Sequence, residues 1–493
     1  MAEPSTPQNG APFHWRQLLA FEAVCEAGGI GQAAERMRRT QPAVSQAILK
    51  MEASLGVSLF ARGREGSALT RAGDILHRRV RRLFAQIELG LSAVMGREVA
   101  PEQATSLCRH LSDAQLRCHL AIAQHGSAAA AAAALGVSQP AVHRAARELE
   151  RTIGLPLYHR RVHSVQVTAA GATFARHVGR ALQELAQARD EIAESVGLGL
   201  RATADRHGDG AAGIGAAVSV RIAVGVLPMC PPRLIADATQ RVVRQFPSAR
   251  IVVREDDRTA LIEALRYGEL DVIVGALRDP DSDAGLLARP LFDDPYVIAL
   301  RQGHPLLRGG RVTLADLARF DWIAPPDGMP RRAVITALWA QIGEQMARNT
   351  PQVARERVGA GEARGTMRIV AETSSLAMMI AMLCEGDAVT LLSRSQVRHP
   401  RYGDALAALS LPELPATRVV GLTVREDWLP TAAQSAFLQA LDHAAAPYAG
   451  PVVLGDSGMG VVESDAMDRH GVAAVGGSPF VAPQPAAAHR FTA

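Results

Sequence analysis

Apolar positions near the N-terminus predict three short helices. Leu18, Phe21 and Val24 recur every three residues, which is the spacing of one helix face. A pair of glycines then interrupts the pattern, and an alanine-rich stretch over 31–37 predicts a second helix. Thr40 stands where a capping residue would begin the third helix, because hydroxyl side chains favour that position. The apolar face of the third helix comprises Val44, Ile48, Met51 and Leu55. Two helices joined by so tight a turn form a helix-turn-helix.

Alternating residues after the third helix predict a hairpin, and the whole unit then repeats. Strands are expected over 58–61 and 67–70, around a basic loop or wing. The pentapeptide Gln-Pro-Ala-Val-Ser over 41–45 returns as Gln-Pro-Ala-Val-His over 139–143, 98 positions later. Glycine, aromatic and threonine positions match in the same register without a gap. Matches over a whole unit in one register indicate a duplicated structural unit.

Each unit leads into a long amphipathic segment. Apolar residues repeat at steps of three or four from Leu76 to Val94, and at strictly alternating steps from Phe174 to Ile192. An apolar seam as narrow as this packs against a partner helix. We expect the second segment, which has the cleaner heptad, to be the main dimerisation helix. The stretch over 95–112, with a glycine and a proline, is expected to be an irregular break between the units.

Strands and helices alternate from residue 218 onward, which is typical of an α/β domain. Strands are predicted over 220–224, 251–253 and 271–275, and helices over 233–246 and 261–267. The preceding stretch over 197–217 is rich in glycine and alanine and predicts a flexible hinge. From Pro447 the chain has no periodicity, which predicts a disordered tail.

Four blocks of the first unit resemble the DNA-binding domain of LysR-type transcriptional regulators. They lie over 33–37, 41–46, 55–60 and 69–73, and the second unit repeats them over 131–135, 138–144, 153–158 and 167–171. Blocks over 268–275, 290–292, 303–306 and 312–317 resemble the effector domain of the same family. A single DNA-binding unit is usual for the family, so two in tandem depart from its pattern.

The resemblance implies a multidomain fold. Two winged helix-turn-helix domains, rich in α-helix and each followed by a linker helix, precede a two-lobed α/β effector domain like that of periplasmic binding proteins. In the family the linker helix pairs two subunits. The expected boundaries are 15–74 and 113–172 for the winged domains, 75–100 and 173–196 for the linker and dimerisation helices, 197–217 for the hinge, 218–446 for the effector domain and 447–493 for the tail.

Candidate DNA contacts lie opposite the buried face of each third helix, since such a helix enters the major groove. They are Gln41, Pro42, Ser45, Gln46 and Lys50 in the first unit and Gln139, Pro140, His143, Arg144 and Arg147 in the second. Gln can bond adenine and Arg can bond guanine bidentately. Arg62, Arg64, Arg160 and Arg161 of the wings are expected to hold phosphates. The alternative for the second unit is that it serves only for dimer packing.

Basic charge is concentrated locally. The chain has 53 Lys and Arg against 49 Asp and Glu, so its overall charge does not identify a nucleic-acid binder. Between residues 62 and 82 the sequence has seven arginines and only two acidic residues. This cluster predicts either phosphate contact or a solvated helix face.

Effector contacts are predicted from the geometry of two-lobed α/β domains. Ligands bind there between the lobes, near helix N-termini whose free N–H groups favour an anion. The candidates are Leu227, Pro228, Met229, Pro325, Thr373, Ser374 and Ser375. The three hydroxyls fit helix caps equally well. The resemblance implies a small organic acid as the effector.

No motif supports catalysis, a cofactor or a metal site. There is no Gly-x-Ser-x-Gly elbow, and Lys50 is the only lysine, which excludes a lysine-containing phosphate loop elsewhere. Five cysteines without a Cys-x-x-Cys pair predict buried free thiols in a reducing cytoplasm. The most apolar run, over 376–384, is too short to span a bilayer.

The expected function is therefore a cytoplasmic, ligand-responsive transcriptional regulator that is not an enzyme. Its expected partners are double-stranded promoter DNA, a small-molecule effector, a further copy or copies of the chain in a homodimer or homotetramer, and RNA polymerase, but no membrane. The alternative is a solute-sensing or interaction protein whose DNA-binding units no longer recognise sequence.

Overall fold

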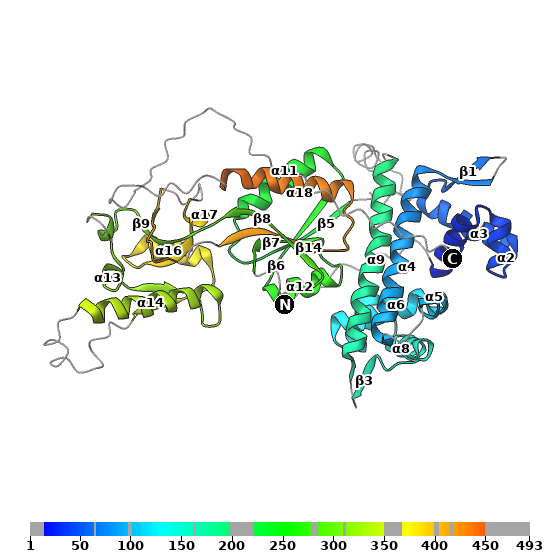
Figure 1. Cartoon of the computed structure of the whole chain (residues 1–493), viewed down its shortest axis with the longest axis horizontal. Coiled ribbons are helices and arrows are strands. Elements are labelled where there is room, and N and C mark those ends of the chain that lie inside the picture. Colours follow the sequence, from blue (N-terminus) through cyan, green and yellow to red (C-terminus); the bar gives the residue numbers. More distant parts are fainter. Residues whose placement is uncertain are drawn as a thin grey trace, which may run out of the picture.

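A computed structural model of the chain places two helical units and an α/β region along an elongated molecule (Figure 1). It describes residues 14–63, 66–96, 101–161, 164–196, 220–278, 284–308, 312–349, 367–398, 404–414 and 418–448. The expected hinge over 197–217 and almost all of the expected tail lie outside these residues. None of the described helices is both long and apolar enough to cross a membrane.

The first helical unit has the expected order of elements. They are α1 (Trp15–Ala27), α2 (Ile30–Arg36), α3 (Gln41–Leu55), β1 (Phe60–Gly63), β2 (Gly66–Leu69) and α4 (Arg71–Met95). Gly28 and Gly56 end α1 and α3 with φ angles of 74° and 69°, a conformation in which a side chain would be strained. Both breaks were visible in the sequence.

The second unit repeats that order in α6 (Asp113–His125), α7 (Ala128–Leu135), α8 (Gln139–Ile153), β3 (Tyr158–Arg161), β4 (Ser164–Val167) and α9 (Ala169–Ser195). Interactions repeat as well. Glu52 Oε1 accepts a hydrogen bond from the Leu59 N–H at 2.7 Å, and Glu150 Oε1 accepts one from the Leu157 N–H at 2.9 Å. These carboxylates hold the start of each hairpin to the end of the helix before it.

The expectation of an irregular break over 95–112 is wrong for most of this stretch, because it contains the helix α5 (Pro101–His110). Ala104 and Cys108 on this helix are almost fully buried, and the Cys108 carbonyl accepts a hydrogen bond from Trp15 Nε1 at 3.0 Å. Proline at the first position of a helix costs little. Pro101 therefore begins a helix here instead of preventing one.

The apolar seams of α4 and α9 pack against each other within one chain. Leu76 and Leu83 on α4 have no exposed surface, and Phe174 and Leu185 on α9 are at most 2% exposed. The expectation that the segment over 173–196 is the main helix between subunits is therefore wrong for this seam. The heptad pattern showed that a partner helix was needed, but α4 of the same chain supplies it.

Five strands form the larger sheet of the α/β region, in the order β6, β5, β7, β14, β8. Their bounds are β5 (Arg221–Val226), β6 (Arg250–Glu255), β7 (Val272–Ala276), β8 (Leu286–Asp293) and β14 (Val419–Arg425), and the helices α11 (Pro232–Gln245), α12 (Arg258–Arg266) and α18 (Ala432–Ala445) accompany them. Strands β5, β6 and β7 are parallel, whereas β14 runs antiparallel to β7 and β8. The 3-10 helix Ala446–Tyr448 follows α18, and Tyr448 stacks on Phe292 at 4.7 Å. The described residues thus extend two residues into the expected tail.

The remaining strands form smaller sheets with a separate core. Strand β9 (Tyr296–Arg301) lies between β12 (Thr390–Ser393) and β13 (Leu406–Leu409), and β10 (Trp322–Ala324) pairs with β11 (Ile369–Glu372). The helical segments here are Pro305–Leu307, α13 (Leu314–Leu317), α14 (Pro330–Asn349), α16 (Leu376–Glu385) and α17 (Arg394–Val397). The chain passes between the larger and smaller sheets twice, from β8 to β9 and from β13 to β14.

All five cysteines are free thiols. The expectation that they are buried is correct for Cys108, Cys118 and Cys230, whereas Cys25 is half-buried and Cys384 is exposed.

Candidate nucleic-acid interface and ligand cavity

Helix α3 separates its apolar and polar residues onto opposite faces. Val44, Ile48 and Met51 are at most 4% exposed and pack into the core of the first unit. The opposite face carries the candidate DNA contacts: Gln41, Pro42, Gln46 and Lys50 are exposed and Ser45 is half-buried. The leading turns of this helix are therefore on the surface of the described chain.

Helix α8 has the same polarity. Val142 and Leu149 are fully buried, with Ala145 and Ala146 beside them. Gln139, Pro140, Arg144 and Arg147 are exposed and His143 is half-buried. Gln139 Nε2 lies 3.4 Å from His143 Nε2, and Arg147 Nε donates to the His143 carbonyl at 3.3 Å. Three of the five candidate residues of α8 thus form one polar group.

The capping expectation at Thr40 is correct for position but wrong for the side chain. Thr40 and its equivalent Ser138 are the N-cap residues of α3 and α8, and both have extended backbone. Neither side chain accepts a hydrogen bond from the first turn of its helix. The proline at the second position of each helix supplies the favourable φ angle there.

Wing arginines lie in the two hairpins, but their side chains are outside the described part of the structure. Arg62 pairs with Ser67 in the β1–β2 ladder, and Arg161 pairs with Ser164 in the β3–β4 ladder. Arg160 belongs to β3. Arg64 lies in the undescribed turn between β1 and β2. Phosphate contact by these four residues remains a prediction.

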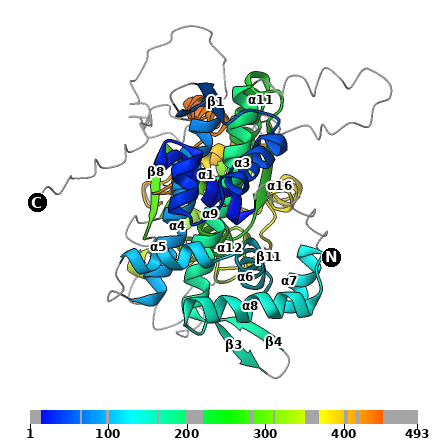
Figure 2. The same ribbon diagram turned by 90° about the vertical axis from the view of Figure 1, so that its right-hand side faces the viewer.

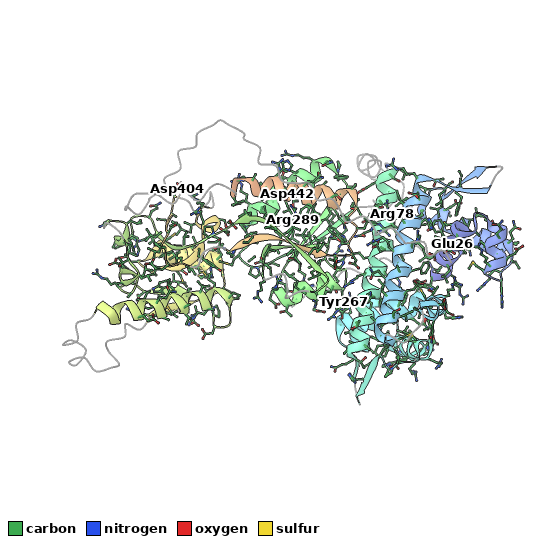
Figure 3. The ribbon with its side chains drawn as sticks, in the orientation of Figure 1. Glu26, Arg78, Tyr267, Arg289, Asp404 and Asp442 are labelled. Atoms are coloured by element: carbon green, nitrogen blue, oxygen red, sulfur yellow. The ribbon has the colours of Figure 1, made fainter. Side chains whose placement is uncertain are left out.

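Three of the seven clustered arginines contact carboxylates of α9, a role that neither expectation included. Arg79 has no exposed surface, and its Nη1 donates to Glu184 at 2.7 Å. Arg82 Nε donates to the same carboxylate at 2.8 Å. Arg78, which Figure 3 labels beside α9, donates to Glu191 at 2.7 Å. The sequence could not show this, because the carboxylates lie more than 100 residues away.

Both α3 and α8 lie on the side of the paired helices α4 and α9 that faces away from the α/β region (Figure 1). The hairpins β1–β2 and β3–β4 lie toward opposite ends of the pair, as Figure 2 also shows. The two helices that carry the candidate DNA contacts thus lie on one side of the α4–α9 pair.

A cavity of about 710 Å³ opens between the loop after β5 and the start of α16. Leu227, Pro228, Met229, Ser374 and Ser375 line it, as the sequence predicted, together with Glu255 at the end of β6. Two predicted effector residues, Pro325 and Thr373, are not among its lining. Candidates from two separate stretches, over 227–229 and 374–375, therefore meet at one cavity.

Met229 has a strained backbone that is held by hydrogen bonds from two residues distant in sequence. Its φ angle of 70° is in the left-handed region, where a non-glycine residue is rare. Its carbonyl accepts hydrogen bonds from Gln396 Nε2 at 3.0 Å and from Arg418 Nη2 at 2.8 Å. Gly275 faces this loop so closely that a Cβ there would lie 2.5 Å from the Leu227 Cβ.

Two of the three hydroxyls near α16 act as local caps. Ser375 Oγ accepts from the Met378 N–H at 3.3 Å, and Thr373 Oγ1 accepts from the Ser375 N–H at 3.1 Å. The capping alternative therefore fits Thr373 and Ser375. Ser375 also lines the cavity.

Arg331 was missed by the sequence predictions, although it lies only six residues after the candidate Pro325. Burial lowers its pKa to about 10, Tyr296 opposes this shift, and Arg418 adds to it. Its Nη1 is buried and has no hydrogen-bond partner among the described residues. Its Nη2 lies 3.2 Å from Met379 Sδ, in the apolar cluster against which Met229 packs. A buried guanidinium without a carboxylate is suited to an anionic group.

Two family models match this chain. The one described as "LysR substrate binding domain" matches residues 216–446. The one described as "Bacterial regulatory helix-turn-helix protein, lysR family" matches twice, over 15–74 and 114–172. Together these matches cover both helical units and the α/β region.

The chain is also similar to individual regulators. The HTH-type transcriptional regulator GalR of Pseudomonas putida is 29% identical over 427 residues, which are 86% of this chain and 95% of GalR. The HTH-type transcriptional regulator PcaQ of Agrobacterium fabrum is 29% identical over 330 residues, which are 67% of this chain and 94% of PcaQ. A solved full-length OxyR variant from Pseudomonas aeruginosa is 22% identical, with a TM-score of 0.44, over 67% of this chain and 97% of that one.

Proposed function

This chain belongs to the LysR-type family of transcriptional regulators, and from that premise we propose that α3 and α8 both bind promoter DNA while a ligand held in the α/β region controls the complex. The matched models and relatives are transcriptional regulators, which are not enzymes. Members of this family bind DNA and small-molecule effectors and act as oligomers.

The observation that carries the proposal is the polarity of α3 and α8. Each helix buries an apolar face and exposes a polar face that begins at its N-terminus. A helix with this polarity can enter the major groove while its unit stays folded. We assign base contacts to Gln41, Pro42, Ser45, Gln46 and Lys50 on α3 and to Gln139, Pro140, His143, Arg144 and Arg147 on α8. Arg62, Arg64, Arg160 and Arg161 are assigned to phosphates.

The domain organisation follows from the same proposal. The two helical units are copies of one winged helix-turn-helix unit, over 15–74 and 113–172, each followed by a linker helix. Residues 218–446 form one effector domain with two lobes, one around each group of sheets. The two passages of the chain between the sheets would allow the lobes to move relative to each other.

The proposed effector is a small organic acid. Arg331 and Arg418 would attract its carboxylate from the side of Met229, since charge-assisted bonds to arginine are strong. Leu227 and Pro228 offer an apolar surface in the cavity. Glu255 is the acidic group of the lining, so a ligand that also carries a hydroxyl or amine donor would fit better than a plain hydrocarbon acid. Binding would shift the lobes and thereby the spacing of the DNA-binding units.

We further propose that the protein works in the cytoplasm and contacts RNA polymerase at its promoters. Both follow from the role of a promoter-bound regulator.

A salt titration of DNA binding tests the proposed function. The full chain is titrated with a duplex from the region beside its own gene and with a scrambled duplex of equal length. Affinity for the native duplex is expected to exceed that for the scrambled one by about 10³-fold or more, and both are expected to fall steeply with salt. Equal affinity for the two duplexes would favour the alternative, an interaction protein that no longer recognises sequence.

A further inference from the structure

One contact between α4 and α9 occurs twice, and the two residue positions that form it are on opposite helices in its second occurrence. Equivalent residues of the two units are 98 positions apart, so Arg79 corresponds to His177 and Gln86 to Glu184. Arg79 on α4 contacts Glu184 on α9. Gln86 on α4 contacts His177 on α9, with 3.1 Å between Gln86 Oε1 and His177 Nδ1. The same pair of positions thus meets twice, which is the signature of a two-fold axis. The order of the contacts also makes the helices antiparallel.

Two further contacts involve equivalent residues directly. Trp15 and Asp113 are equivalent positions, and the Trp15 N–H donates to Asp113 Oδ2 at 2.8 Å. Arg82 and Arg180 are also equivalent, and both contact Asp427 of the α/β region, Arg82 through the Asp427 carbonyl and Arg180 through its carboxylate. Equivalent residues can meet each other, or share one partner, only close to such an axis.

We propose that this chain is its own dimer: its two DNA-binding units take the places that two subunits would occupy, and one chain binds one DNA element made of two unlike half-sites. This inference rests on the proposed function, because it specifies how the DNA is held. It leaves the α/β region free to associate with that of another chain.

Buried charges select this pairing over pairing between identical helices. Arg79 is bound by Glu184, Gln187 and Glu191 of α9. At the equivalent positions α4 carries Gln86, Leu89 and Ala93. Two copies of α4 would therefore bury Arg79 without these carboxylates. Two copies of α9 would place His177 where Arg79 lies, and would leave the partly exposed Arg176 and Arg180 to meet those acids. An unpaired buried charge is strongly unfavourable, and polar positions in a helix seam specify the partner in this way.

The recognition helices differ at the positions that face DNA. Ser45, Gln46 and Lys50 of α3 correspond to His143, Arg144 and Glu148 of α8. Gln favours adenine and Arg favours guanine. A symmetric dimer of identical helices favours a palindrome, whereas these two helices would favour different sequences in the two halves of one element.

Sequence selection with the full chain tests this. Duplexes with a randomised centre are selected by binding, and the selected duplex is then titrated at concentrations well above the dissociation constant. The expected sequence has two unlike halves, and binding saturates at one duplex per 52.3-kDa chain. A palindrome that saturates at one duplex per two chains would overturn the inference. Failure to select any sequence would instead refute the proposed function.

Single substitutions show which recognition helix contacts which half of the DNA element. Gln46→Ala and Arg144→Ala are each expected to lower affinity roughly 5- to 150-fold, and each should relax base preference in a different half. Arg151→Ala, at an exposed position in the last turn of α8, is the matched control and should change neither half. If both substitutions relax the same half, or Arg144→Ala relaxes none, one chain does not bind both halves.

Co-expression distinguishes pairing within a chain from exchange of units between chains. Chains with Gln46→Ala and chains with Arg144→Ala are produced together and purified as a mixture. Pairing within each chain leaves the mixture with only the two weakened complexes. Recovery of a wild-type complex would show that α4 of one chain pairs with α9 of another, which would overturn the inference.

Discussion

Arg79 shows how strongly a single residue depends on its partners. Its guanidinium has no exposed surface and is bound by two carboxylates and an amide from α9. The neighbouring Arg78 binds one of the same carboxylates, but half of its side chain is exposed. Buried and exposed ion pairs with similar distances differ greatly in what their loss costs.

Replacing Arg79 should therefore destabilise the paired helices far more than replacing Arg78. Arg79→Ala leaves Glu184 and Glu191 partly unpaired in a buried site, and breaking such a pair costs about 3–5 kcal/mol. Arg78→Ala, the matched control, should cost less than about 1 kcal/mol. Urea unfolding followed by circular dichroism measures both. Equal midpoints for the two variants would show that the buried network does not hold the helices together.

His119 makes the second unit sensitive to acid. It is fully buried between the Tyr158 hydroxyl and the Gly171 carbonyl, at 2.8 and 3.0 Å, and burial lowers its pKa to about 4 from its usual value of 6.5. The unfolded chain takes up the proton first as the pH falls. Stability present above pH 6.5 is therefore lost progressively between about pH 6.5 and 4.

Exchanging His119 for phenylalanine, the equivalent residue of the first unit, should reduce this loss. The wild-type free energy of unfolding is expected to fall by about 1.4 kcal/mol per pH unit on account of this group, and His119→Phe should lower that slope. His125→Phe, at an exposed position of the same helix, is the control. An unchanged slope in His119→Phe would exclude His119 as the source of the pH dependence.

Among the elements, α9 contacts both α4 and the α/β region, and one glycine allows the second of these contacts. It packs on α4 along its apolar seam, and Gly179 faces the loop after α12, where a Cβ would lie 2.2 Å from the Tyr267 carbonyl oxygen. Figure 3 labels Tyr267 at this junction with the α/β region. A backbone oxygen at that distance cannot move aside easily, so the contact requires glycine.

Gly179→Ala should loosen the junction between α9 and α12. Overpacking of this kind costs about 1–3 kcal/mol, and amide hydrogen exchange over 258–276 is expected to become faster. Gly31→Ala on α2, where a Cβ meets nothing within 4 Å, should leave that exchange unchanged. Unaltered protection over 258–276 in Gly179→Ala would mean that the glycine is not required for docking.

At the scale of the whole molecule, Asp427 joins the α/β region to both linker helices. Its carboxylate accepts a hydrogen bond from Gln86 Nε2 at 2.6 Å and one from Arg180 Nη1 at 3.4 Å, and its carbonyl accepts one from Arg82. A movement of the α/β region would thus reach α4 and α9 together. This junction is well placed to carry an effector response to the DNA-binding units.

Asp427→Ala should uncouple the two parts without unfolding either. Hydrogen exchange at the facing segments of α4 and α9 is expected to increase, while DNA affinity without effector changes by less than about threefold, because the recognition helices are untouched. Asp442→Ala removes the 2.6 Å contact with Arg289 inside the α/β region (Figure 3) and should not affect α4 or α9. The same exchange pattern in both variants would contradict a coupling role for Asp427.

The sequence by itself determined the local structure of this protein and the polarity of its helices. The positions of α3 and α8 followed from apolar spacing, glycine stops and the proline near each start, all of which act within a few residues. The exposed faces of these helices were predicted for the same reason, whereas the loops over 227–229 and 374–375 were predicted from where two-lobed α/β domains bind ligands. Such features depend on neighbours along the chain.

Only the tertiary structure decided which surfaces meet. The seams of α4 and α9 required partners, yet heptad spacing cannot distinguish a partner in the same chain from one in another. The carboxylates that bind Arg79, the burial of α5 behind Trp15, and the unpaired guanidinium of Arg331 all depend on residues distant in sequence. Burial and charge pairing are properties of the folded surface, so their partners are fixed only when the whole chain has packed.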